Sequence, residues 1–160
     1  MITGLHAKIP IQGSRALTVN VEAMLDTNIL IYAATGYADA PEKFEISRGL
    51  LTSEFGVSAQ VLSEFYYNAT CKGSVPLSAD IAGEWVETLA QKPNVAIDVN
   101  IVKHAISLSK KFQTSYWDGA ILAAAIKLGA TTLYTEDLNH GQVYETVRAI
   151  NPFKPHPDFQ

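Results

Sequence analysis

The sequence predicts an α/β fold, in which helices cover both faces of a parallel sheet. Short apolar segments typical of strands alternate with helical segments of about ten residues, and this alternation favours βαβ units. Hydrophobic residues make up 48% of the 160-residue chain and charged residues 18%, as in an ordinary globular protein. A chain of this length can bury one core, so we expect a single domain.

The first half of the chain supplies two expected strands and four expected helices. The apolar run at residues 23–25 leads into Asp26, and we expect a strand there and then a helix over residues 28–34. The polar pair Thr35-Gly36 is predicted to end that helix. The next expected elements are a helix from Pro41 to about Leu51, a strand at 56–58, a helix over 59–72 that ends at Gly73, and a helix from Ser78 to about Ala90.

The second half continues the same alternation. Residues 95–99 alternate as a strand does. A helix over residues 100–112 is predicted by apolar side chains at helical spacing on one face: Ile101, Ala105, Leu108 and Phe112. The last expected elements are a helix over 116–128 that ends at Gly129, a strand at 130–135 and a strand at 147–150.

Two terminal segments are expected to lie outside the domain. Residues 1–21 have no strong periodicity and no apolar run of signal-peptide length, so we expect a loosely structured extension. Residues 152–160 form a tail with three prolines, which leaves 22–151 as the domain proper. The chain has no run of 18 apolar residues, so no membrane-spanning helix is expected.

Charge and cysteine content exclude several classes of protein. The formal net charge is −4, which argues against a protein that binds nucleic acid through a broad basic surface. It does not exclude an enzyme that grips phosphates locally through metal ions. The single cysteine, Cys71, excludes an internal disulfide and a zinc finger and suits a reducing cytoplasm.

Four acidic residues have an ordinary structural interpretation when each is taken alone. Asp26 suits a helix N-cap. Asp118 follows Ser115 at the spacing of a capping box. Glu64 lies in an apolar helix but can face solvent, and Asp137 is a common turn residue.

Taken together, the same four acids indicate a metal site. Asp26 and the pair Glu136-Asp137 follow expected strands, and ligands bind at the carboxyl ends of strands in such sheets. Glu64 and Asp118 lie in the first half of expected helices, so all four can converge on one cleft. Facing carboxylates repel one another unless a cation neutralises them, and oxygen ligands alone select Mg²⁺ or Mn²⁺.

The same residues resemble the PIN domain family. The resemblance rests on Asp26-Thr27-Asn28 after an apolar run, Glu64 in a helix, Asp118 before an Ala-rich helix and Thr135-Glu136-Asp137 after a strand, and it covers residues 22–150. Among PIN domains the chain is similar to the VapC-type toxins of toxin–antitoxin systems. The resemblance implies a three-layer α/β/α fold around a parallel sheet of four to five strands.

The resemblance also implies roles for individual residues. Asp26, Glu64 and Asp118 would be the principal metal-site and catalytic carboxylates, and Asp137 would be the fourth. Asn28 and Thr135 match supporting polar positions. Glu136 and Asp137 are adjacent and need not both point into the site. The family pattern of Thr, any residue, Asp favours Asp137, so Glu136 is the weaker alternative.

The activity implied by the resemblance is hydrolysis of RNA phosphodiester bonds by a metal-activated water, with Mg²⁺ or Mn²⁺ as the cofactor. The implied partners are an RNA substrate, an antitoxin protein and a second copy of the chain in a homodimer. Two alternatives stay open, a PIN nuclease of RNA processing outside a toxin–antitoxin system and a catalytically silent PIN-like binding scaffold.

Several basic residues are candidates for substrate contacts. His140 lies three residues after Asp137, and Lys110 and Lys111 precede the helix of Asp118. Lys72 and Arg48 are further candidates for phosphate contacts. The alternative for His140 is a polar turn residue, and the alternative for each of the others is a solvated surface.

Overall fold

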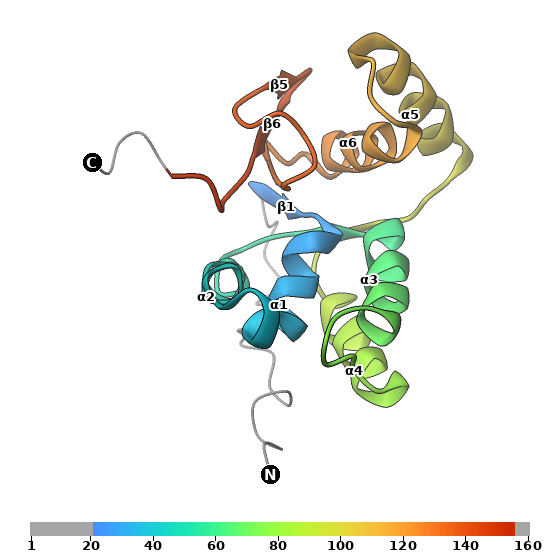
Figure 1. The fold of residues 1–160 in the computed structure, drawn as a ribbon. Helices are drawn as coiled ribbons and strands as arrows, with labels where there is room; N and C mark the ends of the chain where they lie inside the picture. The colour runs from blue at the N-terminus through green and yellow to red at the C-terminus, as the bar shows by residue number, and fades with distance from the viewer. Residues whose placement is uncertain (1–20, 156–160) are drawn as a thin grey trace.

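A four-stranded sheet lies at the centre of the molecule (Figure 1) in the computed structural model, which describes residues 21–155. Its strands, in spatial order, are β1 (Ala23–Leu25), β4 (Thr132–Tyr134), β6 (Val147–Ile150) and β5 (Val143–Tyr144). β4 pairs in parallel with both β1 and β6, whereas β5 is an antiparallel edge strand on β6. The carboxyl ends of β1 and β4 therefore lie side by side.

A second, two-stranded parallel sheet extends the first one. It consists of β2 (Val57–Ser58) and β3 (Asn94–Val95). Gly56 joins the two sheets, because its N–H donates to the Ala23 carbonyl at 2.9 Å and its carbonyl accepts from the Leu25 N–H at 3.2 Å. A Cβ atom on Gly56 would lie 2.9 Å from the Pro93 carbonyl oxygen, so this close approach needs glycine.

Within the described residues, six helices enclose the sheets. They are α1 (Thr27–Asp39), α2 (Pro41–Leu50), α3 (Ala59–Cys71), α4 (Ala79–Leu89), α5 (Val99–Phe112) and α6 (Tyr116–Leu128). Figure 1 shows α1 to α4 on one side of β1 and the pair α5 and α6 on the other. The predicted three-layer α/β/α fold is confirmed.

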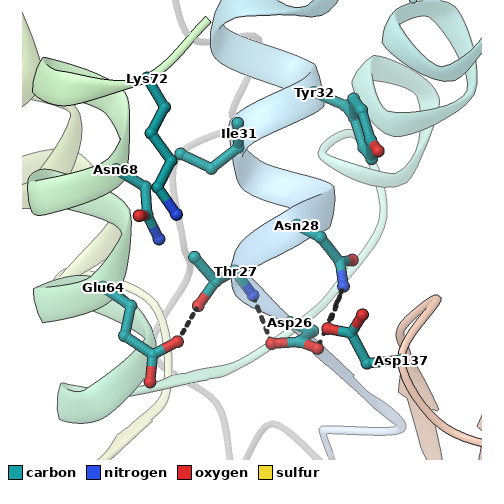
Figure 2. A pocket seen from close by; sticks show the side chains of 9 residues that line it. All are labelled: Asp26, Thr27, Asn28, Ile31, Tyr32, Glu64, Asn68, Lys72 and Asp137. Carbon is teal, nitrogen blue, oxygen red and sulfur yellow. Dashed lines mark hydrogen bonds between the residues drawn. The ribbon is translucent and has the colours of Figure 1, made fainter.

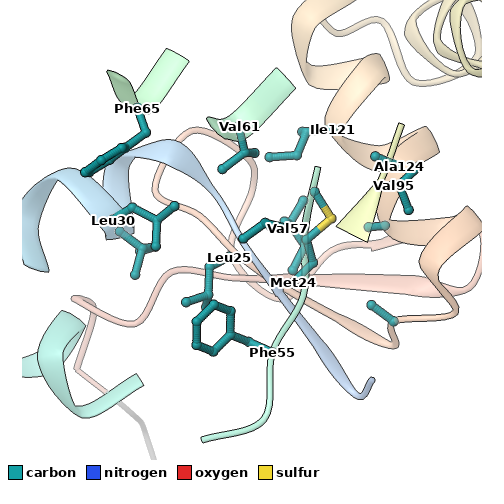
Figure 3. Close-up of a cluster of buried hydrophobic side chains, with 14 of the residues drawn as sticks. Met24, Leu25, Leu30, Phe55, Val57, Val61, Phe65, Val95, Ile121 and Ala124 are labelled. Atoms are coloured by element: carbon teal, nitrogen blue, oxygen red, sulfur yellow. The ribbon is translucent and has the colours of Figure 1, made fainter. Parts of the chain in front are cut away.

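The core fills the space between these layers. Figure 3 shows side chains of β1 and β2 that meet side chains of α1, α3 and α6. Met24, Leu25, Phe55, Val57 and Leu133 are at most 1% exposed. Burial of such side chains stabilises the folded state by roughly 1.5–3 kcal/mol each.

The predicted end of the first helix at Thr35-Gly36 was wrong, because α1 continues to Asp39. Thr35 is compatible with the helix interior since its hydroxyl donates to the Ile31 carbonyl at 3.0 Å. Gly36 is buried, and a Cβ atom there would lie 3.4 Å from the Phe44 Cβ. The small residue thus allows α2 to pack closely on α1.

Other boundaries also differ from the prediction. The strand expected at 95–99 covers only Asn94–Val95, because Asp98 caps α5 by accepting the Ile101 N–H at 2.9 Å. The edge strand β5 was not predicted, since two residues carry too little periodicity. The expected extension lies outside the described residues except for Val21, which is buried, and the last five residues of the expected tail lie outside them too.

Candidate functional site

Asp26 occupies the junction between β1 and α1. Its backbone is extended, and its side chain caps α1 by accepting the Thr27 N–H at Oδ1 over 2.6 Å. The Thr135 hydroxyl donates to Oδ2 over 2.6 Å. The helix-cap interpretation of Asp26 is therefore confirmed, and the same carboxylate lies at the carboxyl end of β1, where a site was expected.

The loop after β4 brings Asp137 next to Asp26. The Thr135 hydroxyl accepts the Asp137 N–H at 3.1 Å while it donates to Asp26. The Asn28 amide nitrogen lies 3.0 Å from Oδ2 of Asp137 and 3.3 Å from Oδ2 of Asp26, as a donor to both. Thr135 and Asn28 thus hold the two acids beside each other.

Glu64 reaches the same place from α3. The Thr27 hydroxyl donates to its Oε2 at 3.3 Å, and the Gln60 amide donates to its Oε1 at 2.8 Å. Glu64 sits on the half-buried side of α3, toward α1. It is therefore a member of the site and does not point freely into solvent.

These acids line a cavity of about 370 Å³ between α1, α3 and the loop after β4 (Figure 2). The lining contains three carboxylates, one ammonium group and several neutral side chains. Its residues are Asp26, Thr27, Asn28, Ile31, Tyr32, Glu64, Asn68, Lys72 and Asp137.

Burial raises the pKa of Asp26 from 3.8 to about 6. The negative charges of Asp137 and Glu64 contribute to this rise of the pKa, while the hydrogen bonds from Thr135 and Thr27 oppose it. The charges of Asp137 and Glu64 therefore repel the charged form of the buried Asp26 carboxylate, and a cation between the three acids would reduce this repulsion.

Asp118 does not line this cavity. It lies in the first turn of α6, and its Oδ2 accepts the Ser115 hydroxyl at 2.8 Å and the Ser115 N–H at 3.2 Å. The Ser115 hydroxyl in turn accepts the Asp118 N–H, so the predicted capping box is confirmed. Within residues 21–155, no three acidic, histidine or cysteine side chains stand close enough together to enclose a metal ion.

Glu136 does not line the cavity. Its carboxylate accepts the Tyr32 hydroxyl at 2.7 Å and pairs with the Lys43 ammonium group. Asp137, in contrast, is a lining residue. Of the two adjacent acids, Asp137 is the one that faces Asp26.

Most of the basic residues predicted to contact the substrate do not line the cavity. His140 accepts the Asn151 N–H at 3.0 Å, in agreement with a turn role. Lys111 pairs with Glu145 at 3.0 Å, and Lys110 is exposed beside it on α5. Neither Arg48 nor these three residues line the cavity, whereas Lys72 does.

Four residues that line the cavity were not predicted from the sequence as site residues: Thr27, Ile31, Tyr32 and Asn68. Asn68 lies four residues after Glu64 and four before Lys72, so helical spacing could have indicated it. No signal of that kind marks Tyr32, whose place depends on the packing of α1 against the loop after β4.

The donor groups of the cavity suit a hard divalent cation. Asp26, Glu64 and Asp137 offer carboxylate oxygens, and no histidine or cysteine of the described part of the chain lines the cavity. The buried Oδ1 of Asn28 has no hydrogen-bond partner among the described residues, which leaves one more oxygen beside the acids. The kinds of ligand therefore fit Mg²⁺ or Mn²⁺, although in this arrangement the acids do not converge closely enough to enclose the ion.

The fold and the site define a class of protein, an α/β/α domain with an acidic cavity at the carboxyl ends of adjacent parallel strands. Residues 23–145 match the family model of the PIN domain, and the chain belongs to the PIN domain family. The predicted family is thus confirmed. No curated protein sequence matches the chain.

Several solved toxin structures share the fold. A toxin–antitoxin complex from Klebsiella pneumoniae aligns with a TM-score of 0.60 at 17% identity, over 83% of this chain and 99% of that one. Mycobacterium tuberculosis VapC20, a toxin that cleaves the sarcin–ricin loop, aligns with a TM-score of 0.56 at 18% identity, over 72% and 89%. DNA-bound VapBC from Salmonella typhimurium aligns with a TM-score of 0.56 at 21% identity, over 81% and 96%.

The helices of residues 21–155 are all too short or too polar to cross a bilayer.

Proposed function

We propose that the protein is a Mg²⁺- or Mn²⁺-dependent endoribonuclease and the toxin of a toxin–antitoxin pair. One observation carries the proposal: three carboxylates from separate segments, Asp26, Glu64 and Asp137, line one cavity at the carboxyl ends of parallel strands. Membership of the PIN family supports the nuclease activity. The structural neighbours, which include a toxin that cleaves the sarcin–ricin loop, support RNA as the substrate.

Asp26, Glu64 and Asp137 would hold the ion. Asp118 is the proposed fourth ligand on the family resemblance, and because both of its capping bonds end on Oδ2, Oδ1 takes no part in the capping box. A divalent ion bound by these residues would supply positive charge at the scissile phosphate and would lower the pKa of water, which favours a nucleophile at neutral pH.

The protein's own groups orient these acids. The Thr135 hydroxyl donates to the Asp26 carboxylate and accepts the Asp137 N–H, so this one group fixes the distance between Asp26 and the Asp137 backbone. Asn28 donates to both carboxylates and so lowers their mutual repulsion. Two acids held in this way keep their oxygens facing the cavity before substrate arrives, which reduces the reorganisation needed for reaction.

The proposed partners are RNA, an antitoxin protein and a second copy of the chain. An acidic cavity favours an antitoxin that presents a basic side chain to it. Exposed Tyr67 and Trp117, at 65% and 64%, are apolar groups suited to such contacts. With one cysteine and this partner set, the cytoplasm is the proposed location.

A second candidate is a catalytically silent PIN scaffold that binds a partner. The orientation of Asp118 toward Ser115 and the lack of an enclosing group of three acids in residues 21–155 favour it. A PIN nuclease of RNA processing would share the first mechanism and differ only in its partners.

Cleavage of labelled single-stranded RNA tests the proposal. We expect cleavage by the wild-type chain with Mg²⁺ or Mn²⁺ and none after chelation. Asp26→Asn and Asp137→Asn should each lower the rate at least about 100-fold, because each removes a charge that would hold the ion. Glu136→Gln is the matched control, since it neutralises the adjacent acid outside the cavity, and its rate should stay within a few-fold of wild type.

Mg²⁺ binding separates the two candidates without reference to activity. Saturating Mg²⁺ should raise the thermal midpoint of the wild-type chain and raise that of Asp26→Asn much less. Metal binding without cleavage of any RNA would favour the silent scaffold. Cleavage by Asp26→Asn at the wild-type rate would contradict the proposed site.

A further inference from the structure

One side of α3 carries three polar side chains along the cavity at regular spacing. Glu64, Asn68 and Lys72 follow one another at intervals of four residues and all line the cavity. Each interval of four residues advances about 6 Å along a helix, so the Cα atom of Lys72 lies about 12 Å beyond the Cα atom of Glu64. Figure 2 shows the Lys72 side chain extending toward the Asn68 amide, with Glu64 further along the same side.

Among residues 21–155, Lys72 is the only basic residue that lines this cavity. No acidic side chain within residues 21–155 forms an ion pair with it, in contrast to Lys43, Lys111 and Lys127. The cavity is therefore negative at one end, where the three carboxylates lie, and positive at the other.

The backbone around Lys72 is held in place. The Lys72 N–H donates to the Asn68 carbonyl at 2.9 Å as the C-cap of α3. Gly73 follows with a φ of +85°, and the Ser74 N–H donates to Oδ2 of Asp39 at 3.0 Å while the Ser74 hydroxyl contacts the other oxygen. These contacts tie the turn to the end of α1, and they leave the Lys72 ammonium group available to a ligand.

This charge arrangement selects an extended ligand. A small anion would be repelled by the carboxylates unless it stayed beside Lys72, and a lone cation would not use Lys72 at all. A chain with regularly repeated anionic groups can place one group at the acids, with a divalent ion between them, and another group at Lys72. A polynucleotide backbone has this pattern.

We propose that Lys72 and Asn68 form a subsite for an RNA phosphate that flanks the phosphate to be cleaved. The proposal rests on the proposed ribonuclease function and identifies where the substrate chain leaves the acidic end of the cavity. Lys72 contributes a point charge, and the Asn68 amide donates a hydrogen bond to a phosphate oxygen or a sugar hydroxyl.

Binding measured against salt concentration tests the subsite. The probe is fluorescent single-stranded RNA of random sequence, followed by anisotropy with Ca²⁺ in place of Mg²⁺. Lys72→Gln should weaken binding roughly 3- to 10-fold near 0.1 M salt and lower the slope of log affinity against log salt by about 0.7, the value for one phosphate contact on a single strand. Asn68→Ala should weaken binding without a change in slope, because the amide is neutral.

Two further variants control for charge and shape. Lys103→Gln removes the same charge from an exposed position of α5 outside the cavity, and its affinity and slope should match wild type. Lys72→Arg should keep the slope. In cleavage assays with Mg²⁺, Lys72→Gln should raise KM with little change in kcat, because the lost contact lies away from the reacting bond.

The outcomes separate this inference from the proposed function. If the wild-type chain cleaves RNA but Lys72→Gln and Lys103→Gln bind it alike, the subsite is overturned and the ribonuclease stands. A wild-type chain that neither binds nor cleaves the RNA overturns both.

Discussion

Asp26 illustrates at the scale of one residue how a functional carboxylate destabilises the fold around it. Two short hydrogen bonds hold its side chain. The residue is nevertheless buried, with only 9% of its surface exposed, and its carboxylate lies near the charges of Glu64 and Asp137. Its pKa rises from 3.8 to about 6, so burial and repulsion outweigh the hydrogen bonds. A shift of this size corresponds to a free-energy penalty of about 3 kcal/mol when the group is charged.

The penalty should depend on pH. Because the folded pKa lies above the unfolded one, the folded chain holds the Asp26 proton more tightly. The penalty is absent below pH 3.8, grows as the pH rises toward about 6, and is complete above it. In metal-free buffer, Asp26→Asn should therefore raise the free energy of unfolding by about 1–3 kcal/mol at pH 8 and by close to zero at pH 4.

Urea unfolding of both proteins with a chelator at pH 4, 6 and 8 measures this difference. Leu25→Val is a suitable control, because it changes a buried apolar neighbour and its effect should be the same at all three pH values. A gap between wild type and Asp26→Asn that does not change with pH would contradict the raised pKa.

The sequence could predict that Asp26 and Asp137 lie at the same edge of the sheet, because both follow parallel strands and the carboxyl ends of such strands share one edge. It also gave two sound interpretations of Asp118, and the capping box is the one present here. The residues alone left both Glu136 and Asp137 open, and only the family resemblance favoured Asp137. That choice depends on Lys43 and Tyr32, which lie about 100 residues away and reach Glu136 only in the folded chain.

At the scale of elements, α5 and α6 pack unusually closely at Gly119. A Cβ atom on Gly119 would lie 2.3 Å from the Ala105 carbonyl oxygen and 3.1 Å from the Ser109 nitrogen, both backbone atoms of α5. Backbone cannot move aside as a flexible side chain can. The residue after Asp118 therefore sets how near α6 approaches α5.

Gly119→Ala should lower the free energy of unfolding by about 1–3 kcal/mol, because the added methyl group forces the two helices apart. Gly83→Ala in α4 is the matched control, since nothing lies within 4 Å of its added Cβ, and it should stabilise the chain by up to about 1 kcal/mol. Chemical denaturation of both variants provides the measurement. Equal effects of the two substitutions would show that helix propensity, and not close packing, decides the outcome.

Periodicity predicted which helices form and in what order they follow one another. It predicted the residues at which they end less well. Thr35-Gly36 is a break signal in sequence, but a hydrogen bond to Ile31 and the approach of Phe44 make both residues acceptable inside α1. Tertiary packing overrides local propensity in this way wherever a small residue allows close contact.

At the scale of the whole molecule, both described ends of the chain are tied to the domain. Phe153 packs its ring edge against Tyr32 with centroids 5.2 Å apart, and the Lys43 ammonium group lies over both rings. At the other end, the Glu22 carbonyl accepts the N–H groups of Thr131 and Thr132, each at 3.0 Å. The boundary predicted near residue 22 thus lies next to residues that hold β1 against the start of β4.

The contacts at this end predict where the chain can be shortened. A chain that starts at Met24 loses the buried Val21 side chain, both hydrogen bonds to the Glu22 carbonyl and the hydrogen bond from the Gly56 N–H to the Ala23 carbonyl, whereas a chain that starts at Val21 retains them. We expect the Met24 start to be less stable than the Val21 start by about 3–5 kcal/mol, from roughly 1.5 kcal/mol for one buried aliphatic side chain and about 1 kcal/mol for each hydrogen bond. Thermal and urea unfolding of the two chains, each compared with the full-length protein, measures the difference. Equal stability of the two shortened chains would mean that β1 needs no support ahead of Met24, and the domain would then begin at Met24.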